Sequence, residues 1–179
     1  MTAEVVKKTE IEGILIINRP TFSDERGFFK ETFRLGELEE AGGIKFNIVQ
    51  QNHSRSLKGT LRGIHIAPWN KLVYCVSGEV QEVIVDLRAD SQTFGKHISL
   101  TLGEDNKVAV FIPNGCGNAF QVLSDEADYT YLTDGYWEVG KELAVAWDEA
   151  QLNIKWSILP PILSEKDKQN STIKEFLEK

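Results

Sequence analysis

Residues 59–80 read GTLRGIHIAPWNKLVYCVSGEV, two short apolar alternations on either side of a proline-containing turn. Alternation of this kind predicts two β-strands, TLRGIHI and KLVYCV. Polar and charged side chains normally avoid the inside of a sheet, yet Arg62, His65 and Lys71 follow one another closely within these strands. The stretch therefore raises the question of why half-buried strands present these three side chains.

The rest of the chain repeats this pattern of short apolar alternations, with turn residues between them. Many short strands at about ten-residue spacing, without helical patterns between them, predict an all-β fold, an antiparallel sandwich or barrel. We expect strands within residues 13–18, 27–33, 60–66, 71–76, 80–88, 97–102, 107–112, 118–123 and 128–133.

Two short helices are expected beside the strands. LGELEEAG (35–42) ends in the glycine that suits a helix C-terminus, and STIKEFLEK (171–179) opens with Thr172 and Glu175 in capping-box spacing. No internal repeat, low-complexity tract or linker divides the chain. We therefore expect one domain over residues 1–179.

Length and composition restrict the function classes. With 179 residues, 41% of them hydrophobic, the chain is long enough for a compact domain with a real core. A formal charge of −7 argues against general nucleic-acid binding, whereas a local group of Arg and Lys would still suit a phosphorylated small molecule. No apolar run approaches the roughly 20 residues that span a bilayer, and MTAEVVKKTEIEG lacks the apolar segment of a signal peptide. We expect a cytoplasmic, soluble protein without a membrane partner.

Cysteine and histidine usage gives no sign of a metal site. Cys75 and Cys116 each lie in an apolar stretch, so we expect buried free thiols rather than a disulfide. His53, His65 and His97 form none of the usual metal-binding spacings, and no glycine-rich loop leads from a strand into a helix. We expect neither a catalytic metal nor a nucleotide held by an α/β phosphate loop.

Strand alternation assigns the side chains of TLRGIHI to two faces. It predicts Arg62 with Ile64 and Ile66 on one face, and His65 with Gly63 on the other. A bend near Gly63 would shift these faces. Spacing alone favours the interpretation that His65 is a hydrogen-bonded core histidine and that Arg62 belongs to a solvated face.

Six motifs in order resemble the dTDP-4-dehydrorhamnose 3,5-epimerase family: DERGFFKETF, GTLRGIH, KLVYCVSGEV, VDLRADSQTFG, FIPNGCGNAFQVLSD and LSEKD. The resemblance runs from about Ile11 to Asp167 and covers nearly the whole chain. It implies a cupin-type β jelly roll that works without a metal or an organic cofactor on a nucleoside-diphosphate-linked 4-keto-6-deoxy sugar. It also implies a homodimer, in which we expect the apolar segment GILIIN (13–18) to pair with the sheet of a neighbouring barrel.

The chemistry that the resemblance implies is proton transfer beside a ketone. The C4 ketone acidifies the protons on C3 and C5, a base removes one, and an acid on the other face returns a proton with inverted configuration. His65 matches the family's base and Asp167 the carboxylate that pairs with it. Lys71 matches the lysine aimed at the keto oxygen, and Tyr131 aligns with the acid. Without the resemblance, Tyr131 is equally well interpreted as a barrel tyrosine with a local hydrogen-bond partner.

The resemblance also implies residues that bind the nucleotide, the diphosphate or the sugar. Trp137 aligns with an aromatic residue that stacks on the base, and Tyr136 fills that role if the loop shifts by one residue. Ordinary surface ion pairing is the alternative for any single charged residue of this set. The other implied binding residues are Arg26, Glu31, Gln50, Asn52, Arg62, Asn118, Glu142 and Lys166.

Two departures from the family pattern affect the substrate prediction, and a third, at Glu82, keeps the charge and changes geometry rather than chemistry. Asn118 replaces a histidine that contacts the sugar, so a positioning role survives while a proton-relay role does not. The loop IAPWN (66–70) is several residues shorter than in typical members, and Glu82 stands where the family has Asp. We expect conversion of dTDP-4-dehydro-6-deoxyglucose to dTDP-4-dehydrorhamnose. Epimerisation of a GDP-linked 4-keto heptose, or of C3 alone in another deoxysugar, is the alternative.

Two other interpretations of the function stay open. One is a cupin that binds a sugar nucleotide without catalysis, which the missing histidine at Asn118 favours. The other is a 3,4-ketoisomerase, an enzyme with a pair of histidines in the strand that contains His65. The residue two places after His65 is Ala67, which counts against a ketoisomerase.

Overall fold

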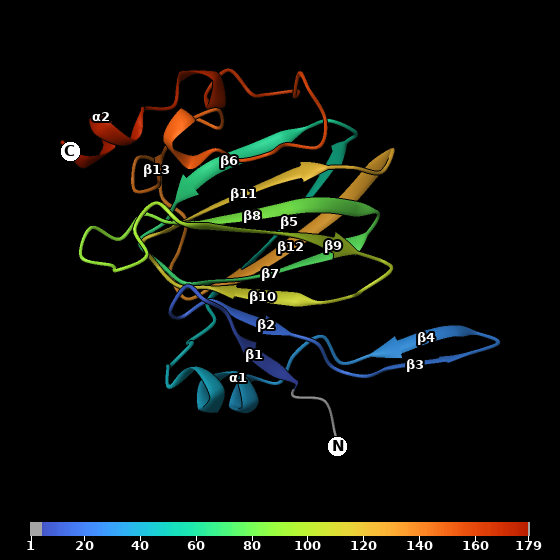
Figure 1. The fold of residues 1–179 in the computed structure, drawn as a ribbon. Helices are drawn as coiled ribbons and strands as arrows, with labels where there is room; N and C mark the ends of the chain where they lie inside the picture. Colours follow the sequence, from blue (N-terminus) through green and yellow to red (C-terminus); the bar gives the residue numbers. More distant parts are fainter. Residues whose placement is uncertain (1–4, 179) are drawn as a thin grey trace.

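The computed structural model describes residues 5–178, which form two facing antiparallel sheets and a protruding hairpin (Figure 1). In spatial order, the six-stranded sheet contains β1 (Val6–Lys8), β2 (Leu15–Ile17), β10 (Ala109–Ile112), β7 (Lys71–Ser77), β12 (Glu126–Thr133) and β5 (Gln50–Leu57). The five-stranded sheet contains β13 (Leu143–Ala144), β6 (Leu61–Ile66), β11 (Cys116–Val122), β8 (Glu79–Asp86) and β9 (His97–Gly103). The hairpin consists of β3 (Thr21–Asp24) and β4 (Gly27–Lys30). The helical elements are α1 (Leu35–Gly42), α2 (Ile173–Leu177) and the 3₁₀ turns η1 (Ala150–Leu152) and η2 (Asp167–Gln169).

The main core lies between the two sheets. Inner side chains such as Val73 on β7, Val110 on β10, Ile84 on β8 and Phe120 on β11 meet there in one buried cluster. Alternate residues of each strand point to this cluster, which is the pattern from which the strands were predicted. Removal of this apolar surface from water holds the two sheets face to face.

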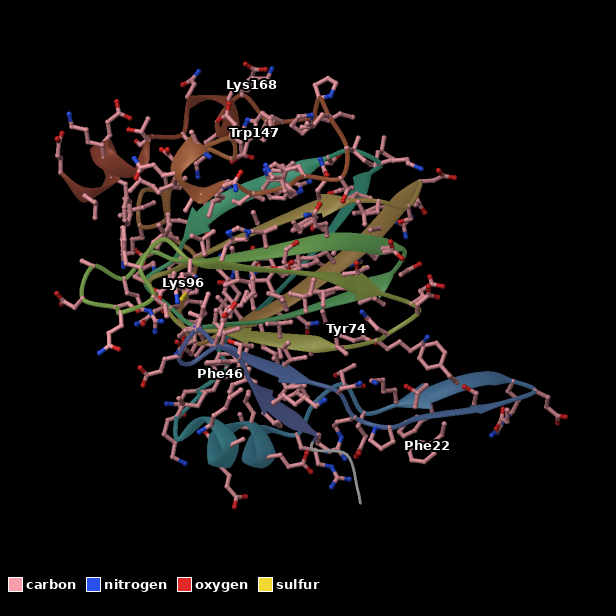
Figure 2. The ribbon with its side chains drawn as sticks, viewed as in Figure 1. Phe22, Phe46, Tyr74, Lys96, Trp147 and Lys168 are labelled. Atoms are coloured by element: carbon pink, nitrogen blue, oxygen red, sulfur yellow. The ribbon has the colours of Figure 1, made fainter. Side chains whose placement is uncertain are left out.

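Two more apolar clusters cover the outer faces of the sheets. On the six-stranded sheet, α1 contributes Leu38 to a cluster with Phe46, which is labelled in Figure 2. Phe46 meets Phe111 edge to face with ring centroids 5.3 Å apart. On the five-stranded sheet, Ile64 and Ile66 pack against buried side chains of η1 and α2. The C-terminal segment is thereby held over β6, which positions η2.

The predicted elements are mostly confirmed. Each of the nine predicted strand segments contains a strand, and the predicted helix over residues 35–42 has those bounds. The C-terminal helix is shorter than predicted: α2 has five residues, and Thr172, which precedes it, forms a capping box with Glu175 in its first turn. Residue 179 of that prediction, like residues 1–4 of the expected domain, lies outside the described residues.

The predicted faces of β6 are wrong at Arg62. His65 lies opposite Asn118 and Arg62 opposite Phe120, so β6 has one residue more than β11 over this span. This β-bulge interrupts the alternation. As a result, Arg62 and His65 both lie on the inner face, while Ile64 packs on the outer one.

The apolar segment 13–18 pairs within its own chain. β2 is bonded to β1 on one side and to β10 on the other, so neither edge of β2 is free for the expected pairing with a neighbouring barrel. Both cysteines are free and buried, as predicted. The part of the chain that the structure describes has no helix with the length and apolar character needed to cross a membrane.

Candidate active site

Four polar side chains expected at a site lie on the inner faces of the two sheets. β6 supplies Arg62 and His65, and β7 begins with Lys71. In the antiparallel register of β7 and β12, Lys71 is opposite Thr133 and Tyr131 is two residues away on the same face. Rigid strands therefore carry all four side chains.

His65 and Asp167 form a hydrogen-bonded pair. Nε2 of His65 lies 2.6 Å from Oδ1 of Asp167, whose side chain is 5% exposed. Ser164 Oγ donates to Asp167 Oδ2 at 2.9 Å, and Asn170 Nδ2 donates to Oδ1 at 3.3 Å. Burial acts to raise the pKa of Asp167, but the hydrogen bonds from His65, Ser164 and Asn170 and the charge of His65 bring it below its usual value. An ionised carboxylate thus lies behind the ring and leaves Nδ1 as the nitrogen that accepts a proton.

The bulge that carries His65 requires a glycine. Gly63 has a φ of +139°, and a Cβ there would lie 2.3 Å from the Cβ of Ala119 on β11. Asn170 Nδ2 donates to the carbonyl oxygen of Gly63 at 3.3 Å, which ties the η2 turn to the bulge. The bulge and the C-terminal turn therefore position His65 and Asp167 together.

Lys71 is a buried ammonium group with a carboxylate partner. Its side chain is 7% exposed, and Nζ lies 3.2 Å from Oε1 of Glu142. Glu142 directly precedes β13, which pairs with the end of β6 beside His65. Of the three N–H groups of Lys71, the described contacts use one for Glu142, which leaves donors for a bound oxygen atom.

Tyr131 presents its phenol next to these charges. Lys71 Nζ lies 5.7 Å from the centroid of the Tyr131 ring. Burial and then the negative charge of Glu142 raise the pKa of Tyr131, while the charge of Arg62 acts in the opposite direction. Within residues 5–178 the hydroxyl has no hydrogen-bond partner, unlike the barrel tyrosine of the alternative interpretation. Tyr131 is therefore a protonated phenol with its donor free.

Glu82 is a fully buried carboxyl group that links the two sheets. Tyr129 on β12 donates to its Oε2 at 2.9 Å, and Asn118 Nδ2 donates to its Oε1. Burial raises the pKa of Glu82 to about 8, against the opposing effects of Tyr129, Lys71 and Asn118. The sequence motifs did not reveal Tyr129, although its position two residues before Tyr131 places it on the same face.

Gln50 and Asn52 lie beside Tyr131 on the edge strand β5. Asn52 is opposite Tyr131, and its Oδ1 accepts a hydrogen bond from Gln50 Nε2 at 2.8 Å. Gln50 Oε1 accepts from the backbone N–H of Trp137 at 3.1 Å, which connects β5 to the loop after β12. Asn52 Nδ2 is buried and has no hydrogen-bond partner among the described residues. This amide therefore offers a donor to a ligand.

Four expected binding residues are open to solvent around this group. Arg62 is exposed on the inner face, and its Nε donates to Ser56 Oγ at 3.0 Å. Tyr136 precedes Trp137 on the loop after β12, and the two residues are 65% and 50% exposed. Lys166 is exposed and directly precedes Asp167.

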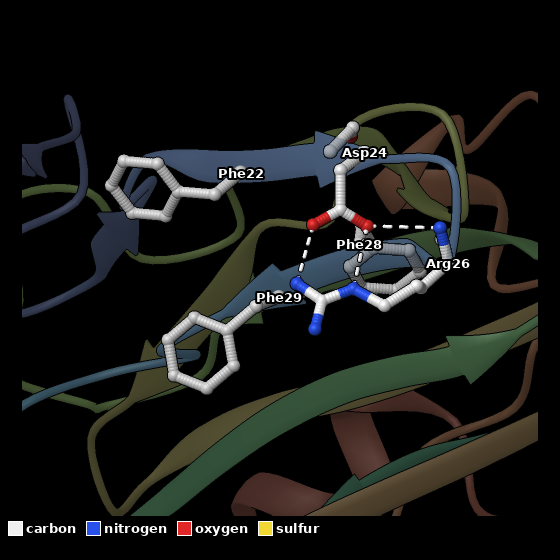
Figure 3. Close-up of a pocket in the computed structure, with 7 residues that line it drawn as sticks. Phe22, Asp24, Arg26, Phe28 and Phe29 are labelled. Carbon is white, nitrogen blue, oxygen red and sulfur yellow. Dashed lines mark hydrogen bonds and ion pairs between the residues drawn. The ribbon is translucent and has the colours of Figure 1, made fainter.

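Arg26 and Glu31 lie on or beside the β3–β4 hairpin, apart from these residues. Arg26 bonds Asp24 through Nε at 3.1 Å and Nη2 at 2.6 Å (Figure 3). Glu31 accepts from Arg19 at 2.6 Å and from Arg34 at 3.0 Å. The hairpin projects from the sheets (Figure 1), so one copy of the chain does not bring Arg26 to His65. The binding roles of both residues stay predictions.

The inner faces of the two sheets thus carry a carboxylate-paired imidazole, a buried ammonium group and a protonated phenol. Such groups can remove a proton, stabilise the negative charge that results and supply a proton. Together with the two antiparallel sheets, they define a class: a cupin-type jelly-roll isomerase that works by proton transfer.

Comparison with known proteins identifies the family. A family model described as dTDP-4-dehydrorhamnose 3,5-epimerase matches residues 8–175. The chain is 46% identical over 166 residues to the dTDP-4-dehydrorhamnose 3,5-epimerase of Shigella flexneri, an alignment that covers 90% of this chain and 92% of that protein. The chain belongs to the dTDP-4-dehydrorhamnose 3,5-epimerase family.

Solved structures of the same kind confirm the jelly roll. A 4-keto-6-deoxy sugar epimerase from the novobiocin biosynthetic gene cluster of Streptomyces spheroides superposes with a TM-score of 0.94 at 32% identity, covering 97% of this chain and 89% of that one. The dTDP-6-deoxy-D-glucose-3,5-epimerase of Legionella pneumophila, solved in complex with dTDP-4-keto-L-rhamnose, gives a TM-score of 0.89 at 38% identity. That alignment covers 94% of this chain and 92% of that one.

The buried carboxyl of Glu82 predicts a pH-dependent stability. Because the folded state holds its pKa near 8 and the ordinary value is 4.5, the unfolded chain ionises first, and stability falls as pH rises between these values. Glu82→Gln does not titrate. The free energy of unfolding of Glu82→Gln minus that of wild type should therefore increase by about 4 kcal/mol as the pH rises from about 5 to about 8.5. Urea unfolding at each pH measures this difference. The control Glu165→Gln, at an exposed position, should change this free energy by less than about 1 kcal/mol. Parallel pH profiles of Glu82→Gln and wild type would contradict the shift.

Proposed function

We propose that the chain converts dTDP-4-dehydro-6-deoxyglucose into dTDP-4-dehydrorhamnose by inverting C3 and C5. The observation that carries the proposal is that His65, Lys71 and Tyr131 all lie on the inner faces of the two sheets, with Asp167 of η2 hydrogen-bonded to His65. The name of the Shigella flexneri relative and the ligand of the Legionella pneumophila structure support the same reaction and the same sugar nucleotide.

The first step is removal of a proton from C3 or C5 by Nδ1 of His65. The electron pair of the broken C–H bond moves toward C4, and the ketone becomes an enolate. Asp167 stabilises the imidazolium that forms and keeps the ring in one orientation. Lys71 donates to the enolate oxygen, where an already desolvated ammonium group is more effective than one in water.

The second step is reprotonation from the opposite face by Tyr131. The enolate electrons form a new C–H bond with the phenolic proton, and the C4 carbonyl is restored with inverted configuration at the carbon. The phenolate then takes a proton from solvent and the imidazolium returns one, so both groups are reset. A pKa of Tyr131 raised by burial supports this role, because the phenol stays protonated until the carbanion forms.

The nucleotide and the diphosphate are bound by residues that lie beside His65, Lys71 and Tyr131. The unpartnered Nδ2 of Asn52 and the guanidinium of Arg62 supply donors to oxygen atoms, and Lys166 adds positive charge. The half-exposed Trp137 offers a ring for stacking on the base, with Tyr136 beside it. Glu142 orients Lys71, and Gln50 holds Asn52 in place.

A homodimer accounts for the position of the hairpin. Phe22, Phe28 and Phe29 are 56% to 66% exposed there and line a hollow of about 490 Å³ together with Arg26 (Figure 3). Apolar rings concentrated on a projecting two-stranded hairpin favour a partner surface over water. In the proposed dimer, a second copy of this chain covers the rings, and Arg26 reaches the nucleotide-binding residues of that second copy.

Replacement of His65 tests the reaction. In deuterated water, wild type should exchange the C3 and C5 protons of dTDP-4-dehydro-6-deoxyglucose, followed by mass spectrometry. His65→Ala should lower kcat by about 10²- to 10⁴-fold, since a positioned general base contributes that much. Tyr131→Phe should still exchange the sugar protons that His65 removes. It should lose the product with inverted configuration, which NMR detects.

The matched control is His53→Ala. His53 also lies against a carboxylate, with Nε2 2.7 Å from Asp128 Oδ1, but on the outer face of β5. It should keep kcat within about twofold of wild type, since exposed pairs contribute little. Wild-type rates in His65→Ala, or no exchange by wild type with any 4-keto sugar nucleotide, would overturn the proposed function.

The nucleotide preference follows from the same proposal. The kcat/KM for dTDP-4-dehydro-6-deoxyglucose should exceed that for a GDP-linked 4-keto-6-deoxy sugar by at least about tenfold, measured side by side. The short loop 66–70 and Asn118 favour the second candidate, a GDP-linked 4-keto heptose or a C3-only substrate. Exclusive turnover of GDP sugars, or deuterium at C3 alone, would replace the first candidate with the second.

Light scattering tests the dimer. Wild type should have twice the 20.2 kDa mass of one chain at micromolar concentration. The double variant Phe22→Ser/Phe29→Ser should have a mass in solution closer to 20.2 kDa, because the substitutions remove exposed apolar area from the hairpin. Arg26→Ala should stay dimeric and bind dTDP about tenfold more weakly. A wild-type species of 20.2 kDa alone would contradict the dimer.

A further inference from the structure

Asn70 lies where three neighbouring strands of the six-stranded sheet end. β7 begins directly after it, and Lys71, its first residue, is opposite Ile112 on β10 and Thr133 on β12. β10 and β12 both end at these two residues. The side chain of Asn70 can therefore reach the loops that follow both neighbouring strands.

The hydrogen bonds of Asn70 join these two loops. Its backbone N–H donates to Asp134 Oδ1 at 2.8 Å, and its Nδ2 donates to Asp134 Oδ2 at 2.5 Å. Its Oδ1 accepts from the backbone N–H of Asn114 at 2.9 Å. A carboxylate that accepts two parallel hydrogen bonds from one residue is fixed in orientation as well as in position. Asn70 thus connects the loop after β10 to the start of the loop after β12.

Two further contacts hold the loop that continues from Asp134. Gly135 packs closely on the buried side chain of Trp69, since a Cβ at Gly135 would lie 3.0 Å from the Cβ of Trp69. The backbone N–H of Trp137 donates to a side chain of β5. The loop is thereby held on both sides of Tyr136, before any ligand binds. A loop that is already ordered loses less conformational entropy when a ligand binds to it.

We propose that Asn70 is a positioning residue for nucleotide binding: through Asp134 it holds Tyr136 and Trp137 where their rings meet the base. This inference rests on the proposed function, in which these two rings contact the base. Lys71 is held separately by its ladder to β10 and β12. Asn70 therefore acts on binding of the nucleotide rather than on proton transfer.

Exchange of the two side chains tests the contact, because Asn and Asp have the same shape and differ in their hydrogen-bonding groups. Asn70→Asp brings two carboxylates together, and Asp134→Asn brings together two NH₂ groups that can only donate. Each single variant should raise the Kd for dTDP about tenfold, measured by calorimetry.

The double variant Asn70→Asp/Asp134→Asn restores one carboxylate and one amide. The bond between the side chains then runs from residue 134 to residue 70, and the backbone N–H groups of residues 70 and 114 keep an oxygen acceptor. The Kd for dTDP should return to within about threefold of wild type. An unchanged Kd in Asn70→Asp, or losses that multiply in the double variant, would overturn the positioning role.

Turnover separates positioning from a general loss of structure. In each single variant, KM for dTDP-4-dehydro-6-deoxyglucose should rise about tenfold while kcat changes less than about threefold, because binding is lost and proton transfer is not. A fall in kcat at unchanged KM would contradict the assigned role.

Asn106→Asp is the matched control. Asn106 also holds a loop, since its Oδ1 accepts from the backbone N–H of Gly103 at 3.3 Å and its Nδ2 donates to the carbonyl oxygen of Thr101 at 2.5 Å. This loop precedes β10, whereas Asn114 follows it, so the two loops lie at opposite ends of that strand. Asn106→Asp should lower the melting temperature and keep the Kd for dTDP within about twofold of wild type.

Failure of the proposed function has a different signature. A wild type that binds dTDP and exchanges no proton with any sugar nucleotide would overturn the reaction, and the dTDP titrations would still decide the role of Asn70. A wild type that binds GDP and not dTDP would overturn the dTDP-linked substrate, and the same titrations with GDP would then decide that role. A wild type that binds neither nucleotide would overturn both proposals.

Discussion

The hydrogen bond between His65 and Asp167 joins residues 102 positions apart and ties the C-terminal segment to the strand that carries the imidazole. A buried carboxylate is costly unless it is paired and hydrogen-bonded, and Asp167 meets this demand through His65, Ser164 and Asn170. Asn170 donates to Gly63 as well, so the same contacts hold the η2 turn against β6. The contacts that orient the imidazole therefore also hold the C-terminal segment against β6.

The bulge in β6 explains why Arg62, His65 and Lys71 follow one another in half-buried strands. Without it, period-two alternation would place Arg62 and His65 on opposite faces, one of them in an apolar layer. The extra residue at Gly63 moves both to the inner face and leaves Ile64 to pack outside. Alternation within one strand cannot reveal this shift, because the bulge is a mismatch with the partner strand β11.

Much of the fold was predictable from apolar alternation, and much of the site was not. β5 reads QQNHSRSL and was missed because both of its faces are polar. Its inner residues include Gln50 and Asn52, which lie beside the other polar residues of the site. β13 has only two residues, and all four residues of β3 are exposed, so neither strand shows a buried and an exposed face in alternation. Roles for Asp167 and Lys71 came from the family resemblance. Tyr129 was missed because its partner, Glu82, is near it only in the folded chain.

The charges around Lys71 are balanced in a way that suits a negatively charged intermediate. Glu142 is its direct partner, and Glu82 is the second carboxyl that affects it. If both were ionised, two negative charges around one ammonium group would oppose an enolate. Burial raises the pKa of Glu82 to about 8, so at neutral pH this carboxyl is mostly protonated and still accepts the hydrogen bond from Asn118 through its carbonyl oxygen. With Glu82 protonated, Glu142 is the one carboxylate left in direct contact with Lys71 among the described residues, and the cost of burying Glu82 falls on folding rather than on the reaction.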